Sequence, residues 1–279
     1  MSIKFNGEAM TPNDALGITT VDLEYLAPYY GYELPNMRDF PAPFESDDFF
    51  KDFIGQDKIK NNLEIAIKAA KITGKPLGNV ALIGPYGCGK HTLAKLVVSA
   101  LNANARTVKC SNIVNSGDIV AILTNLSEGD VLLLEDYQNT RRKCRGLFKE
   151  MFLPAIEEHA IDIILGKGPI GNSIHLDLPQ FTLISISPTY NALQELKRSF
   201  DYVCSFEPYT RENISDIIIK KAGEYGNRMN AETAEIITEC TALTPKEAVR
   251  TLKKFEDYAL VNGARLDKLI AIEAKQHLF

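Results

Sequence analysis

Residues 79–101 read NVALIGPYGCGKHTLAKLVVSAL, and this stretch decides the fold of the chain. Residues 80–83 form a short unbroken apolar run, as expected of a strand buried on both faces of a parallel sheet. Beyond a glycine-rich loop, apolar residues recur at helical spacing from Leu93 to Leu101. The stretch therefore predicts a strand, a loop and an amphipathic helix in direct succession.

The loop between strand and helix matches the phosphate-binding pattern GxxxxGK[ST] except at its last position. Its glycines let backbone N–H groups turn towards a phosphate, the helix N-terminus adds partial positive charge, and the lysine reaches the outer phosphates. We predict a nucleotide-phosphate site here, and a plain glycine turn is the alternative. The predicted phosphate-binding residues are Gly84, Pro85, Tyr86, Gly87, Cys88, Gly89, Lys90, His91 and Thr92.

His91 occupies the position at which the pattern has Ser or Thr. That hydroxyl normally ligates Mg²⁺, which prefers hard oxygen ligands, so an imidazole is a poor replacement. Thr92 has a hydroxyl, but one residue further along a helix its side chain points about 100° away. The sequence thus predicts nucleotide binding and leaves open whether Mg²⁺ is bound and whether hydrolysis occurs.

Composition is that of an ordinary globular chain of 279 residues, with 45% hydrophobic and 24% charged residues. It contains no apolar run of membrane-spanning length and no signal-peptide core, so we expect a cytoplasmic location and no membrane. The 5 cysteines are scattered outside any C-x-x-C pair and the 4 histidines are dispersed, which implies neither zinc nor disulfides. A net charge of −5 argues against coating nucleic acid by bulk charge.

Residues 1–48 form an acidic arm with several prolines, tyrosines and phenylalanines. The prolines interrupt any long element, yet the aromatic side chains are too apolar for a purely solvated tail. We expect the arm to dock on something. It packs either on its own domain or on a partner, because exposed aromatic residues at this density mark interfaces.

A helix with one apolar stripe is predicted after Phe49, ending near Thr73. The box Phe53-Ile54-Gly55-Gln56, this helix and the loop at Gly84 resemble the start of an AAA+ ATPase, specifically of the RuvB family of Holliday-junction branch-migration motors. Two further stretches are similar to that family, SGDIVAILTNLSEGDVLLLED at 116–136 and AIDIILGKGPIGNSIHLDLPQFTLI at 160–184. The resemblance extends from about Phe49 to the C-terminus.

The resemblance implies an α/β fold, an AAA+ P-loop NTPase core at 49–210 whose parallel five-stranded sheet lies between helices, followed by a small all-α lid at 211–279. It implies ATP or ADP as ligand and a ring of this chain with itself or a related AAA+ subunit. A β-hairpin at about 163–178, with Gly166–Gly168 near its turn, is the element through which the family grips its partner RuvA. A hairpin retained without a partner is the alternative. The family's winged-helix DNA-binding domain would begin about where this sequence ends, so we expect it to be missing.

The family's catalytic positions hold altered residues here. Glu135 and Asp136 stand at the Walker B place in inverted order, since the family has Asp for the metal and then Glu for the attacking water. Glu135 is therefore the candidate, weak ligand of Mg²⁺. Ser187 corresponds to the sensor-1 Thr and keeps its hydroxyl. Lys197 stands at the arginine-finger position and Lys246 at the sensor-2 arginine, and lysine lacks the planar fork of arginine.

The resemblance also places Ile54 and Tyr209 beside the nucleotide, near the adenine in the case of Tyr209. An ordinary core tyrosine is the alternative for Tyr209. A cationic cluster stands in a stretch that is longer than the family pattern, and it either contacts phosphates or forms a solvated face. The cluster consists of Arg141, Arg142, Lys143 and Arg145.

The residues at these family positions leave two functions open for this chain. In the first, the chain is a RuvB-like ATP-binding protein with a degenerate catalytic site, slow or non-hydrolysing, which acts as a regulatory or structural subunit in a DNA-related assembly. In the second, it is an active ATP-dependent branch-migration motor that takes its DNA contacts from a partner. We favour the first, because motor output needs all the altered positions jointly, and we expect DNA contact to be weak or indirect. A clamp-loader-like subunit would share the core but would not explain the hairpin.

Overall fold

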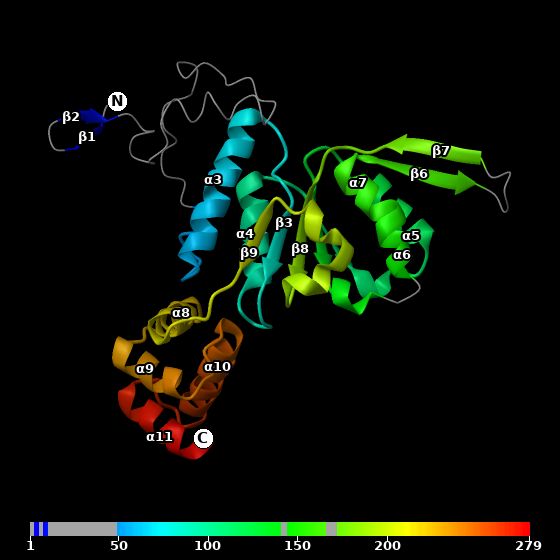
Figure 1. Ribbon diagram of the computed structural model, residues 1–279. Helices are drawn as coiled ribbons and strands as arrows, with labels where there is room; N and C mark the ends of the chain where they lie inside the picture. The colour runs from blue at the N-terminus through cyan, green and yellow to red at the C-terminus, as the bar shows by residue number, and fades with distance from the viewer. Residues whose placement is uncertain (1–2, 6–7, 11–48, 141–143, 166–171) are drawn as a thin grey trace. The chain divides into compact units, whose positions relative to one another are not determined.

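The computed structural model describes residues 3–5, 8–10, 49–140, 144–165 and 172–279 (Figure 1). The chain divides into two units, Met1–Asp47 and Asp48–Phe279. In the first unit, β1 (Ile3–Phe5) and β2 (Glu8–Met10) pair as an antiparallel hairpin. Most of the acidic arm lies outside the described residues, so its docking on the domain or on a partner stays a prediction.

A parallel sheet of five strands forms the centre of the second unit, with the order β4-β5-β8-β3-β9. The strands are β3 (Val80–Ile83), β4 (Ala105–Lys109), β5 (Val131–Glu135), β8 (Thr182–Ser187) and β9 (Tyr202–Ser205). Because all strands run the same way, the loops after β3, β5 and β8 leave from one edge of the sheet, where open α/β sheets bind ligands. The architecture confirms the predicted fold class.

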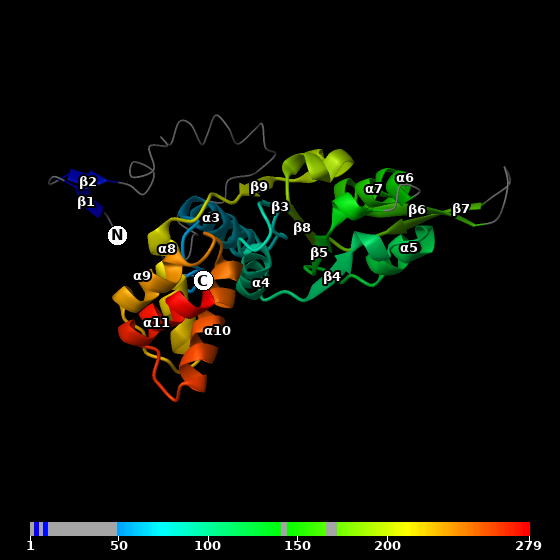
Figure 2. The ribbon, with the colours of Figure 1, turned by 90° about the horizontal axis from the view of Figure 1, so that it is seen from below.

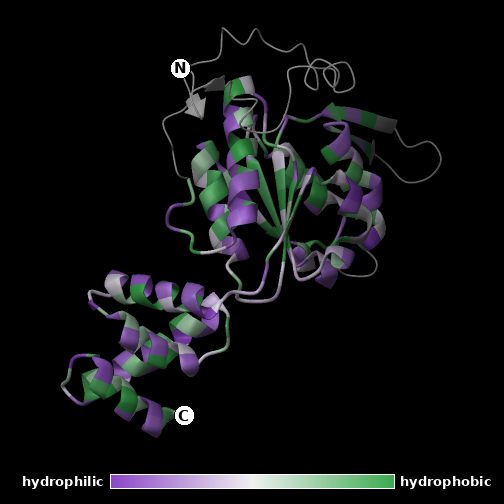
Figure 3. Cartoon of the chain, turned by 60° about the vertical axis from the view of Figure 1, so that its left-hand side comes forward, coloured by the Kyte–Doolittle hydropathy of each residue, from purple (hydrophilic) through white to green (hydrophobic). Residues whose placement is uncertain are grey.

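Helices cover both faces of the sheet, which explains the unbroken apolar strands. Val80 and Leu82 belong to one hydrophobic cluster, whereas Ala81 and Ile83 belong to a second cluster on the opposite face. This alternation follows from the strand period of two residues. Figure 3 shows the hydrophobic strands between helices whose outer surfaces are hydrophilic.

The first cluster includes side chains of α3 (Asp57–Thr73) and α4 (Lys90–Leu101). The second includes side chains of α5 (Ser116–Thr124), the π-helical turn η4 (Phe148–Phe152), α7 (Leu153–Glu157) and the 3-10 helix η5 (Tyr190–Ser199). Figure 2 shows these two groups on opposite sides of the sheet. The short turns η1 (Cys110–Asn112), η2 (Tyr137–Asn139) and α6 (Arg145–Leu147) complete this region. Within the described part of the chain, none of the helices has the length and apolar character needed to cross a membrane.

An antiparallel hairpin of β6 (Ala160–Leu165) and β7 (Asn172–Asp177) extends away from the five-stranded sheet (Figures 1 and 2). The sequence places this hairpin at about 163–178, but β6 begins earlier because Ala160 and Ile161 are buried at the base of the hairpin. The predicted turn at Gly166–Gly168 lies outside the described residues.

The C-terminal region, residues 211–279, is called the lid below and is entirely helical in its ordered elements. It consists of α8 (Arg211–Glu224), α9 (Ala231–Glu239), α10 (Pro245–Val261) and α11 (Lys268–Leu278). Ile214 and Phe255 of the lid belong to the same hydrophobic cluster as β3 and α4. The structure thus keeps residues 48–279 as one unit, and the predicted boundary at 210 stays a prediction.

Candidate functional site

A cleft of about 860 Å³ lies between the loop after β3 and the lid. Its volume is within the range of small-molecule sites. Several of the predicted residues line it, namely Ile54, Tyr86, Gly87, Gly89, Lys90, His91, Thr92, Tyr209 and Lys246. Gly84, Pro85 and Cys88 belong to the same loop but do not line the cleft. The structure therefore brings the predicted phosphate-binding loop and the sensor-2 position together.

Glycine is required in this loop by both backbone conformation and close approach. Gly87 and Gly89 have φ angles of 85° and 99°, which L side chains rarely adopt. A Cβ at Gly89 would lie 3.1 Å from the ring of Phe53, and one at Gly87 would lie 2.9 Å from Cβ of Lys246. The loop thus approaches its surroundings as closely as a backbone without side chains allows.

Lys90 is buried and bonds to its own loop. Its Nζ donates to the carbonyl oxygens of Gly84 at 2.6 Å and of Pro85 at 2.7 Å. A phosphate held by the loop would exchange these bonds for stronger charge-assisted ones. Lys90 is therefore in position to serve the role predicted for it.

The lid contacts the loop through Lys246, the second residue of α10. The backbone amide of Lys246 donates to the Gly87 carbonyl at 3.2 Å. Its Nζ donates to the Tyr86 hydroxyl and lies 3.9 Å from the centre of the Tyr86 ring. This hydrogen bond and the lysine charge lower the pKa of Tyr86. The cation at the sensor-2 position is thus directed at the phosphate loop itself.

Tyr209 is both a core residue and a wall of the cleft. Its hydroxyl donates to the Cys88 carbonyl at 3.0 Å, and burial raises its pKa well above the ordinary value. Apolar side chains of Leu96, Ile217 and Val249 also line the cleft. A cleft lined by both apolar side chains and lysines fits a nucleotide, whose base is apolar on its faces and whose phosphates are anionic.

Sequence reasoning missed the contribution of α8 to this cleft. Ile217, Lys220 and Glu224 line it, and they lie on one face of α8 because they are three or four residues apart. Lys220 forms an ion pair at 2.6 Å with Asp52, which also lines the cleft. The helical spacing of these residues could have shown that they share a face of α8. Only the folded chain shows that this face and the phosphate loop line the same cleft.

Glu135 ends β5 and is paired with His91. The imidazole Nε2 lies 3.0 Å from Oε1 of Glu135, and the side chains are 60% and 14% exposed respectively. The next residue, Asp136, has a φ of 57°, a left-handed conformation that is unfavourable for a residue with a side chain. The two carboxylates predicted for the Walker B place are thus separated by a sharp change of backbone direction.

The remaining catalytic predictions lie outside the cleft of their own chain. Ser187 is buried at the end of β8, and its hydroxyl donates to the Thr189 carbonyl at 2.9 Å. Lys197 donates to Oδ1 of Asn191 at 2.7 Å. Of the cationic cluster, Arg145 begins α6, whereas residues 141–143 lie outside the described residues, so its phosphate contact stays a prediction.

The described residues were searched for side chains that could bind a metal ion and for disulfide bonds. They contain no group of three or more His, Cys, Asp or Glu side chains placed to hold a metal ion. The thiols of Cys88, Cys110, Cys144, Cys204 and Cys240 are free. The Mg²⁺ that this kind of loop implies would have to use Glu135, whose Oε1 is already bound to the imidazole.

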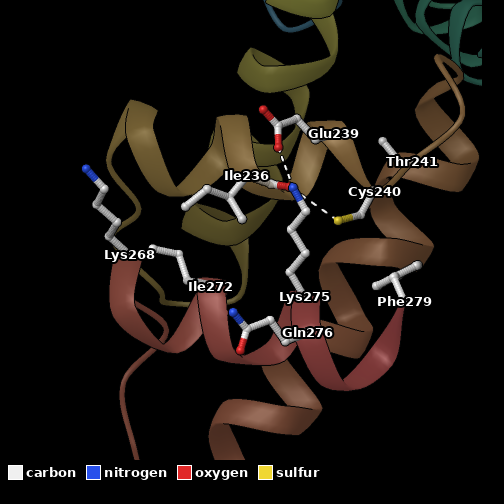
Figure 4. A pocket seen from close by; sticks show the side chains of 9 residues that line it. All are labelled: Ile236, Glu239, Cys240, Thr241, Lys268, Ile272, Lys275, Gln276 and Phe279. Atoms are coloured by element: carbon white, nitrogen blue, oxygen red, sulfur yellow. Dashed lines mark hydrogen bonds and ion pairs between the residues drawn. The ribbon is translucent and has the colours of Figure 1, made fainter.

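A second pocket, of about 960 Å³, lies in the lid between α9 and α11 (Figure 4). Lys268 and Lys275 line it, but Lys268 is paired with Glu232 at 2.8 Å and Lys275 with Glu239 at 2.6 Å. Their charges are therefore already neutralised. The cleft at the phosphate loop, and not this pocket, is the candidate site.

Known proteins are similar to this chain in both sequence and structure. A family model described as Holliday junction DNA helicase RuvB P-loop domain matches residues 46–204. The Holliday junction branch migration complex subunit RuvB of Staphylococcus aureus (strain JH9) is 36% identical over 228 residues, which cover 81% of this chain and 66% of that protein. The chain thus spans just under two thirds of the length of this curated relative.

Solved structures give the same result. The Thermotoga maritima RuvB Holliday junction branch migration motor matches with a TM-score of 0.71 at 29% identity, covering 85% of this chain and 72% of that one. A point mutant of the same protein matches with a TM-score of 0.72 at 30% identity, covering 82% and 71%. The family match includes the phosphate loop, the strand that ends in Glu135, and the hairpin. This chain belongs to the RuvB P-loop domain family.

Proposed function

We propose that this chain binds ATP and ADP in the cleft between the phosphate loop and the lid, and acts as a slow or non-hydrolysing RuvB-like subunit in a DNA-related assembly. One observation carries the binding part. The cleft joins a glycine loop that contains buried Lys90 to a lid that presents Lys246. Two cations and a helix N-terminus converge where the phosphates of a nucleotide would lie.

Slow hydrolysis is supported by the residues that would act on the outer phosphate. Lysines at 197 and 246 keep the charge but cannot clamp a phosphate through two parallel N–H bonds as arginine does. The carboxylates of Glu135 and Asp136 differ by one methylene each from the family order. Displacements of about 1 Å in a catalytic arrangement cost about a hundredfold in rate.

Ring assembly is part of the proposal, with a second copy or a related AAA+ subunit as neighbour. Lys197 does not line the cleft of its own chain, which supports a role on the nucleotide of the next subunit. A RuvA-like partner is supported by the hairpin, since Ile163, Ile174 and Leu176 share one face, and the latter two are exposed. DNA contact would then be weak or made through the partner.

An active branch-migration motor is the second candidate. It is supported by the retained lysine of the loop, by the two carboxylates at 135 and 136, and by the hairpin. Both candidates predict nucleotide binding, so turnover separates them.

The experiment is calorimetric titration of the full chain with ATP and ADP, followed by a phosphate-release assay. We expect binding that is lost in Lys90→Ala, and turnover about 10³-fold or more below that of a working motor, because an arginine finger alone contributes about 10³ to 10⁵. Turnover near one per second, of the order of typical enzymes and abolished by Lys90→Ala, would establish the motor instead. Absence of nucleotide binding to the unmodified chain would overturn the proposal.

A further inference from the structure

The pair formed by His91 and Glu135 spans the sheet edge from one loop to another. His91 is the second residue of α4, directly after the phosphate loop that follows β3, whereas Glu135 ends β5. Strand β8 lies between β3 and β5 in the sheet. The imidazole therefore reaches across the end of β8, and its Nε2 comes to 3.0 Å from Oε1 of Glu135.

These two positions are the ones from which a P-loop site supplies its metal ligands, a hydroxyl after the lysine and a carboxylate at the strand end. Here His91 stands at the position of the hydroxyl, and Mg²⁺ disfavours its imidazole nitrogen as a ligand. That nitrogen is bound to the carboxylate of Glu135. A hydroxyl is shorter than an imidazole and would leave a gap between the two positions. The imidazole ring fills this gap, so the residues present do not fit Mg²⁺.

The backbone of Glu135 is held at the end of the sheet. It is paired in the sheet with Lys109 of β4 and Ile186 of β8, and its side chain is largely buried. The neighbouring Asp136 follows the end of β5 in a left-handed conformation with a φ of 57°.

We propose that this chain binds nucleotide without a divalent cation, because the His91–Glu135 pair occupies the metal position. The inference rests on the nucleotide binding proposed above and adds the form of the ligand, free ATP or ADP rather than the magnesium complex. The phosphate charge is met by Lys90, by Lys246 and by the N-terminus of α4. His91 thereby sets which form of the nucleotide is recognised.

Calorimetry with ADP tests this on the full chain, in Mg²⁺ and in EDTA. For the unmodified chain we expect Mg²⁺ not to lower the Kd for total ADP, since the cation is not bound in the site and only converts part of the free ADP into its magnesium complex. His91→Thr restores a hydroxyl and frees Glu135, so we expect Mg²⁺ to tighten its binding by about tenfold or more, equivalent to about 1.4 kcal/mol.

The hairpin offers a matched control. His175 is paired with Asp162 at 2.9 Å and its side chain is 62% exposed, so it resembles His91 in both contact and exposure but lies outside the cleft. His175→Thr is expected to leave the Kd values in Mg²⁺ and in EDTA as they are in the unmodified chain. A change in this control equal to that in His91→Thr would overturn the role of His91.

The outcomes separate this inference from the proposed function. Binding by the unmodified chain that weakens tenfold or more in EDTA would overturn metal independence and leave nucleotide binding intact. A His91→Thr variant that stays metal-independent would overturn the role of the pair. No binding under either condition, for the unmodified chain and Lys90→Ala alike, would overturn both proposals.

A direct measurement needs no variant. Mn²⁺ bound beside a nucleotide on a protein enhances the relaxation of water protons, so the unmodified chain with Mn²⁺ and ADP is expected to give no enhancement. Enhancement by the unmodified chain would contradict the inference even if His91→Thr failed to fold.

Discussion

Three residues that depart from the family pattern are each bound to a partner within their own chain. His91 bonds to Glu135, Lys197 to Asn191, and Lys246 to the hydroxyl of Tyr86. His91 and Lys246 are exposed, so these contacts orient the side chains and add little stability. Reverting one residue therefore leaves the others in their present arrangement.

We predict that His91→Thr alone changes ATP turnover little, because the inverted carboxylates and the lysines at 197 and 246 remain. The combined change His91→Thr, Glu135→Asp, Asp136→Glu, Lys197→Arg and Lys246→Arg is expected to raise turnover by about 10³ or more, since residues of one catalytic unit act non-additively. A phosphate-release assay on assembled protein measures both. A single variant as fast as the combined one would contradict this prediction.

At this scale the sequence predicted the loop and Lys90, because a contiguous motif determines its own backbone. It also identified His91 and Glu135 as departures from the pattern. Their mutual contact could not be predicted, since it depends on the order of β5, β8 and β3 in the sheet and on the reach of an imidazole across that edge.

The hairpin of β6 and β7 has two chemically different faces. One face carries Ile163 opposite Ile174, and the other carries Asp162 opposite His175. Cross-strand pairs of this kind are the units that stabilise a two-stranded element. The hydrogen bond with Asp162, together with the charges of Asp162, Asp177 and Glu158, raises the pKa of His175.

The raised pKa gives the hairpin a pH dependence of defined sign. The stabilisation by the pair is complete below the ordinary histidine pKa of about 6.5 and is lost as pH rises through the raised pKa of the folded hairpin. We predict that Asp162→Asn lowers the pKa of His175. Titration of the His175 ring by NMR measures this, with His277 of the lid as internal control. An unchanged His175 pKa in Asp162→Asn would refute the assignment.

Strands were predictable where burial on both faces produces a continuous apolar run, as in β3. The start of β6 was not predictable in this way. Ala160 and Ile161 pack into the core at the base of the hairpin, and their residue types alone do not indicate this burial. Likewise, the face of α8 that lines the cleft contains both polar and apolar residues. The spacing of these residues in the sequence therefore does not show that the face lines a cleft.

In the whole second unit, one hydrophobic cluster runs from the sheet through Phe53 and Tyr209 into the lid. The predicted division at residue 210 followed the change from α/β to all-α sequence. Local pattern could not show that the two parts share a core, because this sharing depends on contacts between residues far apart in the chain.

We predict that residues 48–279 unfold in a single transition and that Phe255→Ala destabilises all of it. Phe255 is fully buried in α10, so its truncation is expected to cost about 3 to 5 kcal/mol. Leu260→Ala, at a position 78% exposed in the same helix, is the control and is expected to stay within about 0.5 kcal/mol. Denaturant unfolding followed by circular dichroism and tyrosine fluorescence measures this. Separate transitions for lid and sheet would contradict it.

The bond between the Lys246 amide and the Gly87 carbonyl has a practical consequence. Pro245 has no N–H, so the amide of Lys246 is the first of α10, and an amide in the first turn finds no partner within its own helix. Its protection from deuterium exchange therefore depends on the contact between lid and phosphate loop. The rate at which this one proton is replaced reports how often the cleft opens, in the unmodified protein and without any attached label.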